Sequence, residues 1–248
     1  MYLYSFTRFG GFDKVFKLSA ENLKTKTGDL LQLGSEFFLC LGEKVSFEEL
    51  YGHVETLKNG SMERCYPGFL SKKSIELLHR MVATYYTTYK SVIKLFISDE
   101  VEKLLEREKK SGKLKKIEED GGMSRNIEEL GFSLAESGQT LIVFPDLRTM
   151  SNQQGNTETL GQGNIILLAS NTQNQKDVHR WEIKKGLKSV IICTYAEIFQ
   201  DFKDLKKIIF FDPHKRYYAS QHDPRYKVGE VLKEMKKLHG AEMEIAGI

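Results

Sequence analysis

The sequence predicts an α/β protein with a mostly parallel sheet in its C-terminal half. Between residues 121 and 248, short apolar runs of β type alternate with segments of helical periodicity. The runs are continuous, which is typical of parallel strands that are buried on both faces. Ligands bind at the carboxyl ends of the strands in such sheets, so the polar residues that end the runs are the candidates for function.

The C-terminal half divides into expected strands and helices. We expect strands at 140–145, 164–169, 189–194, 207–212 and 243–246. We expect helices at 126–137, 176–186 and 227–239. Pro145-Asp146, Thr194 and Asp212 end three of these strands and should therefore lie at one edge of the sheet.

Residues 1–65 are rich in aromatic and β-forming residues, which predicts a small β-rich domain. Its clearest strands are expected at 30–33 and 36–41, and Asn59-Gly60 is a turn signal. Residues 71–97 carry apolar residues every three or four positions, which predicts a helical face with one break and Ser71 as its N-cap. We assign the tyrosines of this face to core packing, with a base-stacking surface as the alternative.

Residues 101–120 are dense in charge, with lysines clustered around Gly112. A solvated helix end and linker accounts for this composition, and a basic patch beside a DNA path is the alternative. Together, the changes of pattern predict three domains, at 1–65, 66–105 and 106–248.

Composition bounds the class of protein. The 248 residues are 40% hydrophobic and 29% charged, with a net charge of +3, as in an ordinary globular protein. The three cysteines form no CxxC pair, which argues against a thiolate zinc site. No apolar run approaches the roughly 20 residues that span a bilayer. We therefore expect a cytoplasmic protein without a membrane partner.

Four segments of the C-terminal half carry a resemblance to a known family. Residues 144–149 read FPDLRT, 193–199 read CTYAEIF, 212–214 read DPH and 224–226 read PRY. In the same order, the primosomal protein N′ family of replication-restart DNA helicases has a VPEI-x-LT segment, a GTRSALF strand end, a DEEH box and an RYHAR element. The sequence resembles that family.

The N-terminal half is similar to the same family. Residues 12–17 read FDKVFK, where the family opens with a pattern like LDRTFDY, and residues 77–96 match its YY-containing helix. The resemblance implies a 3′-end DNA-binding-like domain at 1–65 and a winged-helix-like helical domain at 66–105. It implies one RecA-like helicase lobe with a degenerate P-loop at 106–248.

The chemistry of a motor is only partly present. No Gly-Lys-Ser/Thr occurs in the chain, and the position expected for the P-loop holds Gly121, Gly122, Ser124 and Arg125. A Gly-Gly turn with Ser124 as a helix cap is the alternative for this segment. The family uses ATP and Mg²⁺, but we predict no cofactor and no significant ATPase activity here.

The acidic box keeps one carboxylate. Asp212 is the remnant that would hold Mg²⁺ through water, and His214 either aligns with the histidine of the box or is an exposed loop residue. The second carboxylate, which would orient the attacking water, has no candidate in the next three positions.

The resemblance also implies DNA-contacting residues. In the 3′-end domain these are Phe12, Asp13 and Lys17, and Lys17 stands where the family has an acidic residue. In the lobe they are Arg148, Thr149, Thr194, Arg225 and Tyr226. An ordinary surface role is the alternative for each of them.

We expect a DNA-binding protein of replication restart that binds single-stranded or forked DNA and lacks ATPase and helicase activity of its own, with other replication-restart proteins as further candidate partners. Residues 246–248 lie where the family's GSATP motif begins, so the second motor lobe has no counterpart in this sequence. One alternative is an incomplete chain of an active ATP-dependent 3′-5′ DNA helicase. Another is a non-catalytic protein-interaction scaffold on the same fold.

Overall fold

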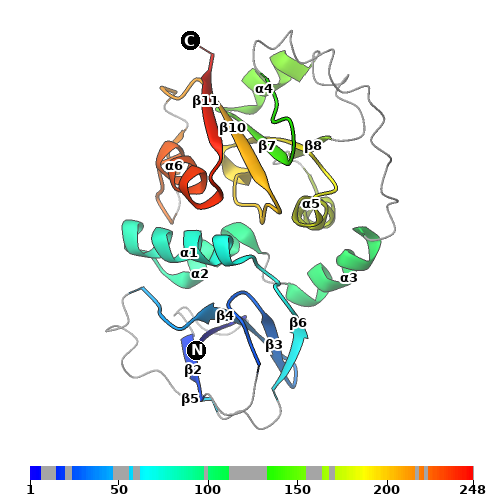
Figure 1. Ribbon diagram of the computed structural model, residues 1–248, viewed down its shortest axis with the longest axis vertical. Coiled ribbons are helices and arrows are strands. Elements are labelled where there is room, and N and C mark those ends of the chain that lie inside the picture. Colours follow the sequence, from blue (N-terminus) through cyan, green and yellow to red (C-terminus); the bar gives the residue numbers. More distant parts are fainter. Residues whose placement is uncertain are drawn as a thin grey trace. The chain divides into compact units, whose positions relative to one another are not determined.

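The chain folds into two compact units, Met1–Val101 and Glu102–Ile248, in a computed structural model (Figure 1). The structure describes residues 1–6, 15–19, 24–46, 56–57, 62–97, 100–111, 133–154, 164–167, 171–215, 218–220 and 223–247. None of the helices in this part of the chain has the length and hydrophobicity that a membrane-spanning helix needs.

The first unit contains a six-stranded sheet in the order β5-β2-β1-β4-β3-β6. Its strands are β1 (Tyr2–Ser5), β2 (Val15–Leu18), β3 (Leu30–Leu33), β4 (Glu36–Gly42), β5 (Thr56–Leu57) and β6 (Glu63–Tyr66). The strands expected at 30–33 and 36–41 are β3 and β4, whereas the turn expected at Asn59-Gly60 lies outside the described residues. One face of the sheet buries Leu3, Leu31 and Phe38 together.

Two helices of the first unit, α1 (Lys72–Tyr85) and α2 (Tyr89–Phe96), confirm the helical face with one break. The hydroxyl of Ser71 accepts a hydrogen bond from the Ser74 amide and so caps α1, as predicted. The helices share a unit with the sheet. The 3′-end-binding and winged-helix-like character of this half stays a prediction.

A hydrogen-bonded network joins these helices to β4. His79 Nε2 lies 2.8 Å from the carbonyl oxygen of Leu41, which can only accept, so Nε2 carries the proton of the neutral ring. His79 Nδ1 then accepts from the Tyr89 hydroxyl at 2.8 Å, and that hydroxyl accepts from the Ser46 amide at 2.6 Å. Tyr89 is fully buried, which agrees with the assignment of this tyrosine to the core.

The second unit contains a five-stranded, wholly parallel sheet in the order β11-β10-β7-β9-β8. Its strands are β7 (Gln139–Phe144), β8 (Asn164–Leu167), β9 (Val190–Thr194), β10 (Leu205–Phe211) and β11 (Glu242–Ala246). All five lie within about two residues of the expected positions. The continuous apolar runs therefore gave the correct strand type, because central strands β7 and β9 are buried at every residue.

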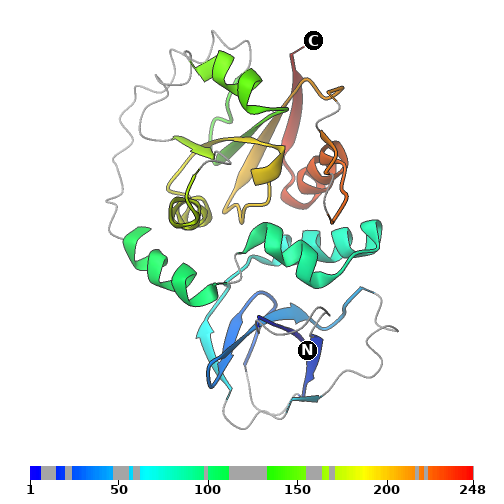
Figure 2. The ribbon, with the colours of Figure 1, turned by 180° about the vertical axis from the view of Figure 1, so that it is seen from behind.

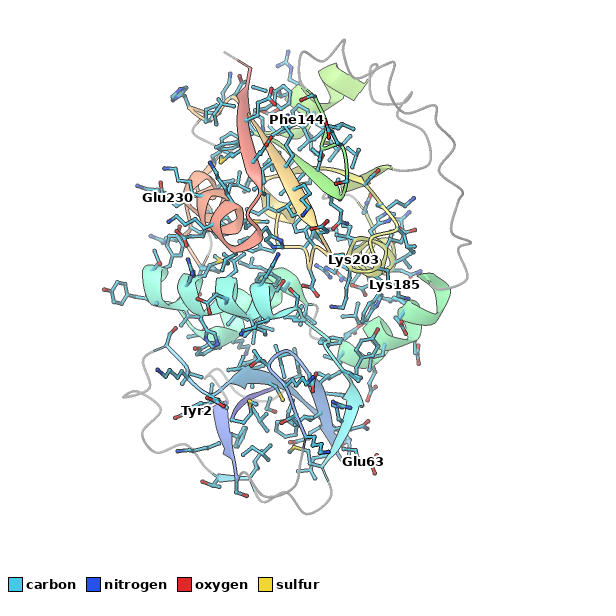
Figure 3. The ribbon with its side chains drawn as sticks, in the orientation of Figure 1. Tyr2, Glu63, Phe144, Lys185, Lys203 and Glu230 are labelled. Carbon is cyan, nitrogen blue, oxygen red and sulfur yellow. The ribbon has the colours of Figure 1, made fainter. Side chains whose placement is uncertain are left out.

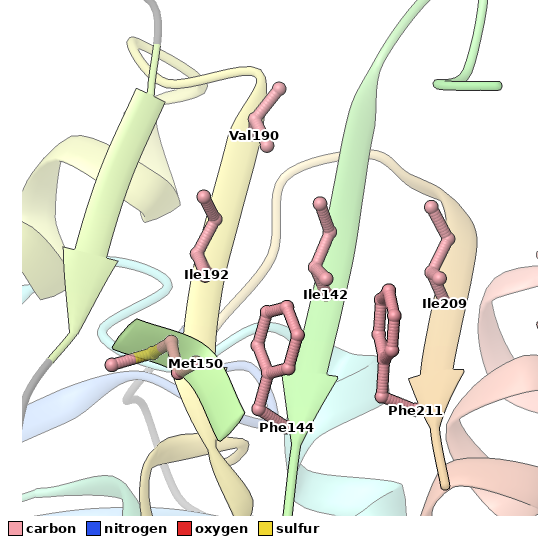
Figure 4. Close-up of a cluster of buried hydrophobic side chains, with 7 residues drawn as sticks. All are labelled: Ile142, Phe144, Met150, Val190, Ile192, Ile209 and Phe211. Atoms are coloured by element: carbon pink, nitrogen blue, oxygen red, sulfur yellow. The ribbon is translucent and has the colours of Figure 1, made fainter. Parts of the chain in front are cut away.

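Helices α4 (Leu147–Gln154), α5 (Gln173–Lys185) and α6 (Val228–His239) flank this sheet (Figure 2). Met150 of α4 covers a face of the sheet formed by Phe144, Phe211 and their neighbours, and the rings of Phe144 and Phe211 are stacked at 4.4 Å (Figure 4). On α6, a Cβ at Gly229 would lie 3.5 Å from the ring of Phe210. The unit is a parallel α/β fold that is compatible with a RecA-like lobe.

Two expectations for the helices of this unit need correction. The helix expected at 126–137 is wrong for residues 133–137, which are not helical, and residues 126–132 lie outside the described part of the chain. Helix α4 was not expected, because its polar sequence LRTMSNQQ has too few apolar residues to show a periodic face.

Helix α3 (Val101–Ser111) lies in the charge-dense segment and contacts α5. The indole Nε1 of Trp181 donates to the Leu104 carbonyl at 2.8 Å. Arg107 pairs with the fully buried carboxylate of Asp177. Lys185 of α5, which is labelled in Figure 3, pairs with Glu108 at 2.9 Å. Arg107 and Glu108 of α3 therefore have partners on α5, whereas Glu102, Lys103 and Glu106 are exposed. The lysine cluster around Gly112 lies outside the described side chains, so its interpretation as a solvated helix end and linker stays a prediction.

Candidate functional site

The candidate site lies at the carboxyl edge of the parallel sheet in the second unit. Strand β7 is central, and the chain leaves it through α4 toward β8 on one side. The chain leaves β10, the neighbour of β7, through α6 toward β11 on the other side. Neighbouring strands whose connections diverge in this way form a topological switch point, where ligands of open α/β sheets bind.

Three of the polar strand ends lie at one edge of the sheet, as the sequence predicted. Val143 of β7 pairs with Phe210 of β10, and Phe144 pairs with Thr194 of β9. Asp146, Asp212 and Thr194 therefore follow or end three adjacent strands.

Asp146 serves as the cap of α4. Its Oδ1 accepts from the Thr149 amide at 2.7 Å and its Oδ2 accepts from the Thr149 hydroxyl at 3.1 Å. A carboxylate at this position also stabilises the positive end of the helix dipole. Both of its oxygens thus have partners in the first turn of α4, and Thr149 is held by the same contact.

Asp212 adopts a left-handed backbone conformation, with φ of 44°, directly after β10. Its amide donates to the Ala246 carbonyl at 2.8 Å, and its own carbonyl accepts from the Lys215 amide at 3.0 Å. Its carboxylate lies over Gly247, where an added Cβ would come within 2.5 Å of Oδ1. A non-glycine residue with positive φ is uncommon and occurs preferentially at functional or tightly constrained positions.

Tyr218 is the residue of this edge that the sequence-based site omitted. Its hydroxyl donates to the Phe211 carbonyl and lies 3.2 Å from the Val143 carbonyl, so one buried phenol joins the ends of β10 and β7. Burial, together with the carboxylates of Asp212 and Asp146, raises the pKa of Tyr218 far above its usual range. The available signal was the pair Tyr217-Tyr218 shortly after Asp212, but nothing in the sequence identified its partners.

The remaining candidates in this unit divide by burial. The side chains of Thr194 and Tyr226 are buried, and Tyr226 packs edge-on against Phe199 at 5.0 Å. Arg148, His214 and Arg225 are exposed. Of these five residues, only the exposed Arg148, His214 and Arg225 offer a charged group or a ring nitrogen for binding a ligand.

The candidates of the other segments are less well defined. Gly121, Gly122, Ser124 and Arg125 lie outside the described residues, as do Phe12 and Asp13. Lys17 lies on β2, with its ammonium group 6.0 Å from the ring centre of Tyr2. The roles expected for all of them stay predictions.

Within the described ranges, no group of three or more His, Cys, Asp or Glu side chains is placed to hold a metal ion. The buried thiol of Cys193 has a pKa raised by burial and by Glu197, which is the behaviour of an inert core cysteine. In comparisons with known proteins, no protein-family model and no curated protein matches this chain.

Proposed function

We propose that this chain is a DNA-binding protein similar to primosomal protein N′ of replication restart, with one RecA-like lobe and without ATPase or helicase activity of its own. Its partners are single-stranded or forked DNA and, through the same process, other replication-restart proteins. The proposal needs no bound cofactor.

One observation carries this proposal. Three segments that resemble the family in sequence, 144–149, 193–199 and 212–214, follow or end β7, β9 and β10, which are neighbours in the sheet. Segments that are separate along the chain thus meet at the edge where α/β sheets bind ligands. Any parallel sheet brings its strand ends to one edge, so the support lies in the resemblance of three segments that follow or end neighbouring strands.

The contacts at this edge favour binding without hydrolysis. Hydrolysis needs one carboxylate to hold Mg²⁺ and another group to orient the attacking water. Asp146 is engaged by Thr149, and Asp212 is followed by Pro213 and an exposed His214. Between these strands, the ring of Tyr218 is 6% exposed and its hydroxyl is bonded to the backbone.

The test is the affinity of the full chain for a labelled forked DNA, measured by fluorescence anisotropy from about 50 to about 200 mM salt. We expect the affinity to fall with salt, because each neutralised phosphate contributes about 0.7–0.9 to the slope of log affinity against log salt. A slope near zero would exclude phosphate contacts and favour a protein-interaction scaffold.

Substitution of two exposed arginines tests whether DNA is bound at the carboxyl edge of the sheet. Arg148→Gln and Arg225→Gln each remove one exposed charge near the carboxyl edge and should each lower the slope by about 0.7–0.9 if that arginine binds a phosphate. The control is Lys233→Gln, which removes an exposed α6 charge that pairs with Glu230 at 3.1 Å. If the slope of log affinity against log salt is the same for the native chain and all three variants, neither Arg148 nor Arg225 binds a phosphate at this edge.

A further inference from the structure

Tyr86, at the corner between α1 and α2, is the most exposed large hydrophobic side chain among the described residues, at 85%. Tyr89, three positions later, is fully buried and hydrogen-bonded to Ser46. The structure therefore separates the tyrosines of this stretch into a core residue and a surface residue. The ring of Tyr86 contributes little apolar burial to the fold.

The backbone at Tyr86 is also unusual. Tyr86 forms the C-cap of α1 in the left-handed conformation, with φ of 49° and ψ of 45°, and its amide donates to the Val82 carbonyl. Glycine is the common residue at such a cap, because a Cβ is unfavourable there. A bulky residue with positive φ is an outlier that often marks a functional position.

The surroundings of Tyr86 in the sequence are basic. Residues 71–97 contain five Lys or Arg and one Glu, so this helical pair has a net charge of +4, more than the +3 of the whole chain. From residue 77 to residue 97 there is no Asp or Glu. On α2, Lys90 and Lys94 are four residues apart and lie on one side of the helix.

An exposed aromatic ring on a helical pair with a net charge of +4 fits a single-stranded nucleic acid, which offers bases for stacking and phosphates for the lysines. Single strands are bound by aromatic rings that stack on bases and by cations that neutralise phosphates. From this combination we infer that the corner between α1 and α2 is a single-strand contact, in which Tyr86 stacks on a base and Lys90 and Lys94 bind phosphates.

This inference rests on the proposed DNA-binding function and assigns one contact to the first unit. It also gives Tyr86 opposite roles in stability and binding. Tyr86→Gly should raise the unfolding temperature, because glycine adopts the left-handed cap without a Cβ. The same variant should bind single-stranded DNA less tightly, because the stacked ring is lost.

The experiment measures binding of a fluorescent oligothymidylate of about 20 nucleotides to the full chain. The native chain and Tyr86→Gly are compared at a temperature where circular dichroism shows both to be folded. We expect Tyr86→Gly to bind about 5- to 150-fold more weakly, the range for removal of one stacked base contact. Lys90→Gln with Lys94→Gln should reduce the salt slope by about 0.7 for each lost phosphate.

Two controls isolate stacking. An abasic oligonucleotide of the same length keeps the phosphates and removes the bases, so the native chain and Tyr86→Gly should bind it equally. Tyr89→Phe removes a hydroxyl from the core network and should lower stability while the folded protein keeps its affinity for oligothymidylate.

The outcomes separate this inference from the proposed function. Equal binding of oligothymidylate by the native chain and Tyr86→Gly overturns the stacking role and leaves DNA binding intact, with a protein contact as the remaining use of the ring. Failure of the native chain to bind either forked or single-stranded DNA overturns both.

Discussion

At the residue scale, Tyr218 holds the ends of two strands together through one hydroxyl. Tyr218→Phe should reduce the free energy of unfolding by about 1–3 kcal/mol, because the buried carbonyls of Val143 and Phe211 lose this donor. Urea unfolding of the full chain, followed by circular dichroism, measures the change.

Tyr226→Phe is the matched control for that substitution. Tyr226 is also buried, but its hydroxyl lies 3.4 Å from its acceptor, the Tyr195 carbonyl, so a smaller loss is expected. If Tyr218→Phe and Tyr226→Phe lower the free energy of unfolding equally, the hydroxyl of Tyr218 stabilises the ends of β7 and β10 no more than the weaker contact of Tyr226 stabilises its own surroundings.

His79 should make the stability of the first unit depend on pH. Burial lowers the pKa of His79 below its ordinary value of 6.5, only partly opposed by the Leu41 carbonyl and Glu76. The unfolded chain therefore takes up a proton near pH 6.5, whereas the folded chain does so only at lower pH. The contribution of neutral His79 to the free energy of unfolding is therefore fully present above about pH 6.5. It is lost as the pH falls from there through the pKa of His79 in the folded chain.

His79→Gln tests this dependence, since glutamine stays neutral and keeps an amide donor for Leu41. Unfolding midpoints of both proteins are compared between about pH 7.5 and about pH 5. The native chain should lose more stability than the variant on acidification, and parallel curves would contradict the role of His79.

At the element scale, α3 is fixed to α5 by a buried carboxylate that serves two arginines. Asp177 has no exposed side-chain surface and pairs with Arg107 and with Arg180, the latter at 2.9 Å. Asp177→Asn should cost about 3 kcal/mol, because both guanidinium groups lose their counter-charge. Trp181, the single tryptophan of the chain, reports the docking, and its fluorescence should shift to longer wavelength as α3 separates.

Glu230→Gln provides the comparison on an exposed helix face. Glu230 and Lys233 have side chains that are 58% and 60% exposed, and such pairs contribute at most about 1 kcal/mol. The tryptophan emission of Glu230→Gln should match that of the native chain. Unchanged emission in Asp177→Asn would show that the remaining contacts, among them Trp181 with Leu104 and Lys185 with Glu108, hold α3 without this carboxylate.

The elements also differ in how far the sequence predicts them. The strands of the second unit were predictable because each is a continuous apolar run, and α1 and α2 because their apolar residues repeat at helical spacing. The docking of α3 was not, since Arg107 and Asp177 are 70 residues apart and charge density alone suggests a solvated segment. Tyr218 was missed for the same reason, as its partners belong to two different strands.

At the scale of the whole molecule, the candidate site follows from strand order more than from any single motif. The sequence predicted that Pro145-Asp146, Thr194 and Asp212 lie at one edge of a parallel sheet, and the sheet order adds that the strands they follow or end are neighbours. It could not predict that Thr149 would be tied to Asp146, or that Thr194 and Tyr226 would be buried. Side-chain partners depend on the packing of distant segments, which periodicity does not encode.

The ATPase prediction belongs to this scale, because turnover needs a phosphate cradle, a magnesium carboxylate and a water-orienting group in one assembly. The sequence has no Gly-Lys-Ser/Thr, and Asp212 has no acidic neighbour in the next three positions. We expect DNA-stimulated phosphate release by the full chain to equal the blank without protein, and Asp212→Ala to leave it unchanged. Turnover that is stimulated by forked DNA and abolished by Asp212→Ala would instead make Asp212 a working magnesium ligand, and would favour an active helicase lineage over an ATP-independent DNA-binding protein.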